Sequence, residues 1–336
     1  MVTETQERSK FGRARGGEAI HLIYPCPPQN VSTEIAHTFS YGMQEFEQDM
    51  QRLCLQLGYR PVAHHIDLPG FAAVLDAIAP GERVFYLCDG NEQDDGVCGL
   101  TPVLHREQQG RPMITAGATF WRNTTSKSRM KRLFVAADVP TAPYRQVTRG
   151  EVWPSFTGMR FPLFVKPDAL YGAVGITDSS VLQSEQEVWT SLPGLLETYG
   201  SLLVEEFVQG REFTVFVLRD GEVFLMAERC FDARLPPTRR FISYERSWID
   251  QTVTYPYRAV RDPEEREQLG AVARSAFHAV EGDEYARIDL RQQEETGTFL
   301  VLEVNSMPGL SDDSSVVACA RVGGKTMLEV IQRILE

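Results

Sequence analysis

Apolar positions in the first part of the chain recur with the periods of strands and helices. Residues 19–24 form a short apolar run closed by prolines, which predicts a strand. Apolar residues then recur at spacings of three and four through residues 43–57, which predicts an amphipathic helix. A second apolar run follows at residues 84–88. Strand, helix and strand in this order predict an α/β lobe with a parallel sheet.

The middle of the chain alternates between helical and extended patterns. Residues 130–137 carry a helical apolar stripe, and two prolines after them mark a turn. Apolar runs at residues 161–165 and 202–208 predict strands. Between them, residues 172–176 form a loop that contains two glycines.

The last part of the chain begins with a predicted hairpin. Residues 212–218 and 223–229 alternate between apolar and polar positions, and Asp220-Gly221 between them is a strong signal for a hairpin turn. The patterns that follow predict a helix over 264–280, strands over 285–290 and 299–304, and a final helix over 327–335.

Composition narrows the class of protein. The 336 residues allow two or three domains, and 34 basic against 46 acidic residues give a formal net charge of −12. An acidic chain without a basic block argues against nucleic acid or a membrane as partner, and no apolar run approaches the roughly 18 residues of a spanning helix. The six cysteines form no CxxC pair, so a reducing, cytoplasmic location is expected. The polar residues 1–18 predict a disordered arm.

Two of the five lysines stand where a phosphate could bind. Lys166 ends an apolar strand and precedes the glycine-bearing loop, and an ammonium beside exposed backbone N–H groups suits a polyphosphate. A surface lysine at a strand end is the alternative. Lys127 stands at the start of a helix, where N–H groups are also free, and a solvated helix face is its alternative.

The two strands near the C-terminus carry the strongest candidate site. Period-two geometry places Arg287 and Asp289 on one face of the first strand, and Glu303 and Asn305 on one face of the second. If the strands are neighbours, the carboxylates and the amide converge as hard oxygen ligands, which suit Mg²⁺ and a substrate phosphate. The alternative is an ordinary charged, solvent-facing surface of an antiparallel pair.

Two glutamates flank the junction between the strands at 202–208 and 212–218. Glu205 lies on the first strand and Glu212 begins the second. The backbone between them could meet an adenine edge, and a carboxylate could accept hydrogen bonds from ribose hydroxyls. When these two glutamates are considered alone, charged side chains on edge strands are a better explanation than a nucleotide contact.

Together these motifs resemble a known family in their order and spacing. The matching segments are Ser126-Lys127, 139–143, 164–167, 204–215, 286–289 and 302–310. They resemble the ATP-grasp enzymes, and specifically the D-alanine–D-alanine ligase branch, from about residue 19 to the end. The resemblance implies an α/β (α+β) fold of three lobes, in which a parallel-sheet lobe precedes two lobes that sandwich ATP. The implied lobes are 19–120, 121–205 and 206–336.

The resemblance also implies roles for individual residues. Two Mg²⁺ ions, or Mn²⁺, would be held by Asp289, Glu303 and Asn305, while Arg287 and the backbone of Gly309 would stabilise an oxyanion. A carboxylate would attack the γ-phosphate of ATP, and an amine would then displace phosphate from the acyl-phosphate. The implied contacts to ATP are Lys127, Lys166, Gly172, Glu205, Glu206, Phe207, Val208 and Glu212.

Several positions depart from the family pattern. The loop at residues 170–175 lacks the two serines of the dipeptide ligases, and Trp248 falls in the place of a Lys-Tyr pair. Glu34 lies near the position of a glutamate that binds substrate, and Ser314 matches a position that binds the substrate carboxylate.

These departures predict a carboxylate–amine ligase that acts on a different acid or amine in specialised metabolism. D-alanine–D-alanine ligase activity itself and a degenerate nucleotide-binding protein are the alternatives. The expected partners are small-molecule acids and amines, and the resemblance implies a possible homodimer.

Overall fold

The computed structural model describes residues 16–27, 43–90, 92, 96–250 and 255–336. The described chain forms two compact units, Met1–Ala118 with Leu310–Glu336 as unit 1 and Thr119–Gly309 as unit 2. Most of the predicted arm and the predicted substrate residue Glu34 lie outside the described residues. The division into three lobes stays a prediction.

Unit 1 contains a parallel sheet, as the sequence pattern predicted. Strand β1 (Ala19–Pro25) lies between β2 (Arg60–Ile66) and β3 (Arg83–Tyr86) and pairs in parallel with both. Every residue of β1 and β3 is buried, which explains their continuous apolar runs. Strand β2 was not predicted, because only Ile66 among its seven residues is buried.

Helices from both ends of the sequence complete unit 1. The final helix contacts both α2 and α9 through an apolar face. Buried Arg83 on β3 donates a hydrogen bond of 2.7 Å from Nη1 to the carbonyl oxygen of Leu335, which ties the C-terminal helix to the sheet. The helices are α2 (Met43–Gln56), α3 (Phe71–Ala77), α4 (Leu100–Gln108), α9 (Ser315–Val322) and α10 (Met327–Leu335).

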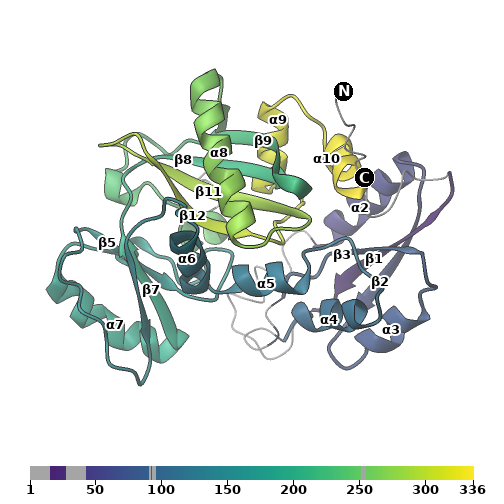
Figure 1. The fold of residues 1–336 in the computed structure, drawn as a ribbon, viewed down its shortest axis with the longest axis horizontal. Coiled ribbons are helices and arrows are strands. Elements are labelled where there is room, and N and C mark those ends of the chain that lie inside the picture. The colour runs from purple at the N-terminus through teal and green to yellow at the C-terminus, as the bar shows by residue number, and fades with distance from the viewer. Residues whose placement is uncertain (1–15, 28–42, 91, 93–95, 251–254) are drawn as a thin grey trace, which may run out of the picture. The chain divides into compact units, whose positions relative to one another are not determined.

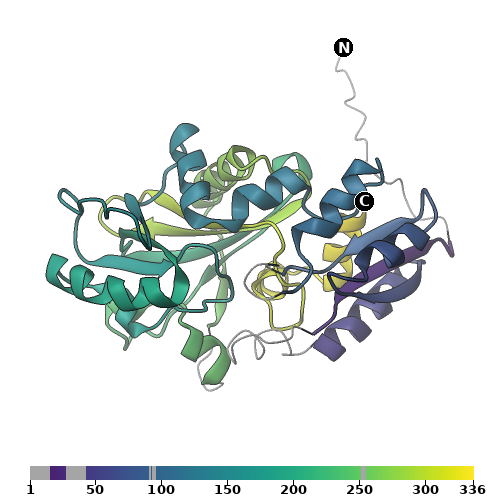
Figure 2. The same ribbon diagram turned by 90° about the horizontal axis from the view of Figure 1, so that it is seen from below.

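Unit 2 contains a four-stranded antiparallel sheet with the order β4-β7-β5-β6. Its strands are β4 (Tyr144–Thr148), β5 (Leu163–Pro167), β6 (Val181–Leu182) and β7 (Ser201–Glu206). Helix α7 (Glu185–Tyr199) covers one face of this sheet (Figure 2). Its Leu192 and Leu196 side chains pack with Val165 and Val204. This helix was not predicted, because Pro193 and Gly194 interrupt its pattern.

The larger sheet of unit 2 has the order β10-β9-β8-β11-β12 and is antiparallel throughout. Helix α8 (Pro263–Ala279) crosses one face, and α6 (Lys127–Ala136) contacts both α8 and β12 (Figure 1). Helix α5 (Ala118–Thr125) precedes α6. The strands are β8 (Gly210–Leu218), β9 (Glu222–Arg229), β10 (Tyr257–Ala259), β11 (Tyr285–Gln293) and β12 (Phe299–Asn305).

The predicted hairpin joins β8 and β9. Asp220 and Gly221 both have positive φ, 59° and 77°, which is the backbone that favours Asp-Gly in a tight turn. At the other end of β8, Gly210 has φ of 145°, and an added Cβ would lie 1.9 Å from the carbonyl oxygen of Gln292. Both the conformation and the close approach of β11 therefore require glycine at residue 210.

Replacing this glycine tests the packing of β8 on β11. Gly210→Ala should lower the free energy of unfolding by about 2 kcal/mol or more, because the methyl group forces the two strands apart. Chemical denaturation measures the effect. Gly194→Ala is the matched control in helix α7: nothing lies within 4 Å of its added Cβ, so alanine should stabilise by up to about 1 kcal/mol. Equal stabilities for the two variants would contradict this account.

Candidate active site

The four polar residues predicted near the C-terminus lie opposite one another on neighbouring strands. Arg287 on β11 pairs in register with Asn305 on β12, and Asp289 pairs with Glu303. The register shifts immediately after Asp289, so an irregularity in the ladder borders the cluster. The structure therefore brings together the set that period-two geometry predicted.

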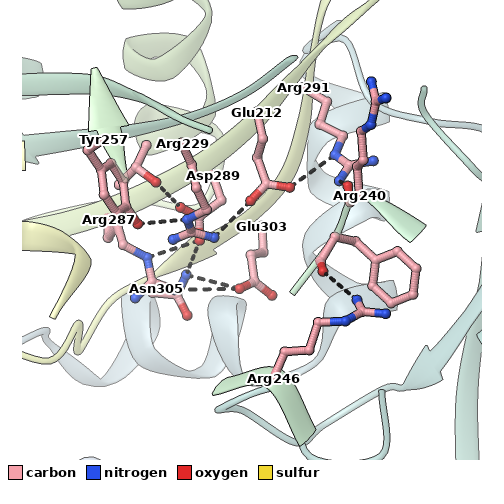
Figure 3. Close-up of polar contacts among 12 residues, drawn as sticks. Glu212, Arg229, Arg240, Arg246, Tyr257, Arg287, Asp289, Arg291, Glu303 and Asn305 are labelled. Atoms are coloured by element: carbon pink, nitrogen blue, oxygen red, sulfur yellow. Dashed lines mark hydrogen bonds and ion pairs between the residues drawn. The ribbon is translucent and has the colours of Figure 1, made fainter. Parts of the chain in front are cut away.

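Direct contacts hold this cluster together (Figure 3). Arg287 Nε donates to Asp289 Oδ2 at 2.9 Å, and Thr214 on β8 donates from Oγ1 to Asp289 Oδ1 at 3.0 Å. The Asn305 side-chain amide reaches Asp289 Oδ2 at 3.4 Å and Glu303 Oε1 at 3.3 Å. Asp289 is buried and Glu303 is half-buried. The carboxylates thus face one common space with an amide between them.

The two carboxylates differ in acidity. Burial raises the pKa of Asp289, and the Arg287 guanidinium offsets this only in part. Burial also opposes ionisation of Glu303, but the Lys127 and Lys166 ammoniums outweigh it and lower the pKa of this carboxyl. The pKa of Glu303 is therefore lowered and that of Asp289 is raised, although the two carboxylates lie opposite each other.

This donor set fits a hard divalent cation. Among the described residues no group of three or more His, Cys, Asp and Glu side chains could hold a metal by itself. Asp289, Glu303 and the amide oxygen of Asn305 would be a partial set, which is how Mg²⁺ binds when water and substrate phosphate complete its shell. A bound cation would favour the ionised form of both carboxylates.

Two lysines approach the cluster from the other elements of unit 2. Lys127 is the first residue of α6, after the N-cap Ser126, and its Nζ donates to the carbonyl oxygen of Leu170. Burial lowers its pKa, and the Glu303 carboxylate opposes this shift more than any other group. Lys166 on β5 lies 2.7 Å from Glu205 Oε1 and also interacts with Glu303. Both predicted phosphate lysines therefore interact with Glu303, one of the two carboxylates of the cluster.

A third lysine belongs to this site although the sequence reasoning assigned it no role. Lys131 Nζ lies 2.6 Å from Glu205 Oε2 and donates to Thr141 Oγ1 at 2.7 Å. Burial opposes the charge on Glu205, but Lys131 and Lys166 together lower its pKa to about 2. The available signal was spacing, because Lys127 and Lys131 are four residues apart and share one face of the helix.

The segment after β7 has mixed contacts. The Glu206 carboxylate accepts from the backbone N–H and from Nε of Arg160, each at 3.0 Å, so this side chain is already engaged. The Phe207 ring lies 6.0 Å from the Phe164 ring, and the Val208 carbonyl accepts from Arg291 at 2.8 Å. The Glu206 carboxylate and the Val208 carbonyl therefore already have hydrogen-bond partners within the protein.

The glycine-bearing loop is covered by residues from the segment between β9 and β10. Trp248 donates from Nε1 to the carbonyl oxygen of Gly172 at 2.7 Å, and the backbone N–H of Tyr244 donates to Ile176 at 3.0 Å. Arg246 forms an ion pair with Asp178 just beyond the loop. Trp248 and Gly172, predicted separately, are therefore direct neighbours.

Two further predicted residues stand at the C-terminal end of unit 2 in the sequence or after it. Gly309 is the last residue of this unit. Ser314 belongs to unit 1, where it is the N-cap of α9 and its hydroxyl accepts from the backbone N–H of Val317 at 3.3 Å. A local helix-capping role thus explains Ser314 by itself.

Comparison with known proteins supplies the family. The family model described as the D-ala D-ala ligase C-terminus matches residues 133–336, which include both sheets of unit 2. The chain belongs to the D-alanine–D-alanine ligase family. The D-alanine–D-alanine ligase of Chromohalobacter salexigens is 31% identical over 277 residues, covering 82% of this chain and 83% of that protein. The enzyme of the same name from Pseudoalteromonas translucida is 29% identical over 258 residues, 76% and 79% of the two chains.

Solved structures share the fold of this family member. The crystal structure of D-alanine–D-alanine ligase from Bacillus anthracis complexed with ATP superimposes with a TM-score of 0.72 at 18% identity, covering 95% of this chain and 96% of that one. The VanG D-Ala:D-Ser ligase of Enterococcus faecalis gives a TM-score of 0.65 at 16% identity, covering 95% and 99%. At these identities the likeness concerns the fold.

These findings confirm the predicted ATP-grasp fold and the prediction of an ATP-dependent, ADP-forming ligase of C–N bonds. Its substrates are accordingly small molecules. None of the helices in the described residues is long and apolar enough to cross a membrane.

The Glu205 ion-pair network of this ligase provides a stability test. Glu205→Gln should lower the free energy of unfolding by about 3 to 5 kcal/mol, because it leaves Lys131 and Lys166 buried without their shared carboxylate. Adding Lys131→Met should recover part of the loss, since one unpaired charge is then removed. Chemical denaturation of the two single variants and the double variant measures the coupling.

The exposed pair between Asp312 and Arg321 provides the control. Asp312 is 75% exposed, so Asp312→Asn should cost less than about 1 kcal/mol. A Glu205→Gln variant of wild-type stability, or a double variant without any recovery, would refute the network.

Proposed function

We propose that this protein is a D-alanine–D-alanine ligase that joins two D-alanine molecules and converts ATP to ADP and phosphate. The observation that carries the proposal is that the buried Lys127 and Lys166 ammoniums both interact with the Glu303 carboxylate, which lies opposite Asp289 in the sheet. The relatives at 29% and 31% identity, both named D-alanine–D-alanine ligase, support D-alanine over the acid or amine of specialised metabolism that the departures from the family pattern predicted.

The proposed reaction has two steps. The carboxylate of the first D-alanine attacks the γ-phosphorus of ATP, the bond to the β,γ-bridging oxygen breaks, and ADP leaves. The amine of the second D-alanine then attacks the acyl-phosphate carbonyl, loses a proton and expels phosphate. Phosphoryl transfer of this kind depends mainly on positioning and charge neutralisation.

The lysines and the carboxylate cluster would divide this work. Lys127 and Lys166 would hold the α- and β-phosphates, with the loop at Gly172 beside them. Asp289, Glu303 and Asn305 would hold Mg²⁺, two ions by family resemblance with Mn²⁺ as a substitute. The metal, when bound, neutralises charge on the phosphates.

Arg287 and the nucleotide contacts complete the proposed site. Arg287, already beside Asp289, and the backbone of Gly309 would stabilise the negative oxygen that develops on the carbonyl under attack. Phe207, Val208, Glu205 and the Glu206 backbone would line the adenine. Glu212 would accept hydrogen bonds from the ribose hydroxyls.

One observation favours a second candidate, a ligase that accepts a different amine. Trp248 contacts Gly172 at a position where the resemblance leads to a Lys-Tyr pair that helps to position substrate. An indole provides apolar surface and one donor, and here that donor is taken by the loop. The pocket for the second substrate would then differ, while the ATP site and the chemistry stay the same.

A direct assay decides between these candidates. The protein is incubated with ATP, Mg²⁺ and D-alanine, and ADP release is followed together with mass spectrometry of the product. We expect ADP and D-alanyl-D-alanine in equal amounts. Turnover with D-alanine only when another amine is added would select the second candidate, and ATP hydrolysis that depends on no acid would contradict both.

The carboxylate cluster can be tested in the same assay. Glu303→Gln should reduce the rate of ADP release by about 100-fold or more, because it removes a charged metal ligand, while thermal unfolding stays cooperative. The matched control is Glu295→Gln in the turn between β11 and β12, where the carboxylate is 76% exposed. Turnover of Glu303→Gln close to that of Glu295→Gln would remove Glu303 from the site.

A further inference from the structure

Two buried arginines that the sequence reasoning did not consider flank Glu212. In the register of the larger sheet, Glu212 on β8 lies directly between Arg229 on β9 and Arg291 on β11. Arg229 Nη1 lies 2.8 Å from Glu212 Oε1, and Arg291 Nε lies 3.0 Å from Glu212 Oε2 (Figure 3). The three side chains are at most 6% exposed. Each oxygen of the carboxylate is thus held from a different strand.

Arg291 reaches two further segments with its remaining nitrogens. Its Nη1 donates to the carbonyl oxygen of Val208 at 2.8 Å, and its Nη2 donates to the carbonyl oxygen of Arg240. The guanidinium also lies 5.2 Å from the centroid of the Phe207 ring and 5.7 Å from that of Phe231. One side chain therefore joins the segment after β7, the carboxylate on β8 and the segment between β9 and β10.

Burying these three charged groups costs a desolvation free energy that a purely structural contact need not incur. The three groups carry a net charge of +1 out of water, and buried ion pairs commonly stabilise a fold no better than apolar side chains of similar volume. Only arginine can donate in three directions from one rigid plane, since the lysine ammonium is a compact point charge. The geometry suits the positioning of a carboxylate for a ligand better than the filling of a core.

The neighbouring row of side chains in the sheet contains the proposed metal ligands. Asp289 is the next residue on the same face of β11 as Arg291, and Glu303 lies opposite Asp289. Arg229 also interacts with Asp289. Glu212 therefore stands one row away from the proposed metal and phosphate ligands, at the position where the sugar of a bound nucleotide would follow its phosphates.

We infer that Arg291 is a positioning residue for nucleotide recognition, which holds Glu212 toward the ribose hydroxyls and couples this carboxylate to the segment at Arg240. The inference rests on the proposed function in taking ATP as the ligand and Glu212 as the acceptor for its ribose hydroxyls. Arg229 is the second support of the same carboxylate. The predicted consequence is discrimination between nucleotides by their ribose hydroxyls, with Arg291 as the residue on which that discrimination depends.

Equilibrium binding tests this inference without turnover. Affinities for ATP and for 2′,3′-dideoxy-ATP are measured with Mg²⁺ by titration calorimetry for the wild type and for Arg291→Met. The wild type should prefer ATP about tenfold or more, since each hydroxyl donates to a charged acceptor. Arg291→Met should bind ATP about tenfold more weakly and prefer it over the dideoxy nucleotide by no more than about twofold.

A second variant and a control separate positioning from general damage. Arg291→Lys retains charge near Glu212 but cannot reach Val208 and Arg240 together, so its preference should fall between those of the wild type and Arg291→Met. If Arg291→Met does not fold, the nucleotide preference of Arg291→Lys tests the inference. Arg258→Gln removes another arginine–glutamate pair on the same sheet, at a side chain that is 62% exposed, and should keep the wild-type preference.

The outcomes are distinguishable. A wild-type preference that both Arg291 variants retain overturns the role of Arg291 and leaves the proposed function in place. Equal binding of the two nucleotides by the wild type also overturns the inference, because ATP binding itself is then intact. A wild type that binds neither nucleotide overturns the proposed function, and the inference with it.

Discussion

The antiparallel register of β8, β9, β11 and β12 is the constraint on which the site depends. It aligns polar side chains in rows across one face of a buried sheet, so that Asp289 meets Glu303 and Glu212 meets two arginines. A shift of one residue in β11 would turn Arg287, Asp289 and Arg291 to the other face. The same strand pairing therefore determines both the packing of this sheet and the positions of the site residues.

Charge balance is the second feature that links the fold to its chemistry. Lys127 begins α6, Lys131 lies one turn further on, and Lys166 comes from β5 of the smaller sheet. Glu205 on β7 pairs with Lys131 and Lys166, while Glu303 on the larger sheet attracts Lys127 and Lys166. The unit thus gathers positive charge from several elements beside carboxylates, an arrangement that suits a phosphorylated nucleotide with a divalent cation.

The segment between β9 and β10 contacts both parts of this arrangement. Trp248 and Arg246 attach it to the region of the glycine-bearing loop, and the backbone of Arg240 receives the hydrogen bond of Arg291. Arg234, in the same segment, pairs with Asp232 and is 90% exposed. The segment therefore contacts the site region through the Arg240 backbone, the Trp248 indole and the Arg246 ion pair rather than through Arg234.

The sequence by itself determined the elements with strong apolar patterns and the pairs of residues that share a face within one strand. Period two placed Arg287 with Asp289 and Glu303 with Asn305, because side-chain direction along a strand is a local property. Strand β2 and helix α7 were not predicted, since exposed residues in β2 and an internal proline in α7 weaken their patterns. Only the tertiary structure brought Lys131 to Glu205, and Arg229 and Arg291 to Glu212. These contacts join distant segments through strand register and helix packing, and burial turns ordinary charged residues into partners that no local pattern can reveal.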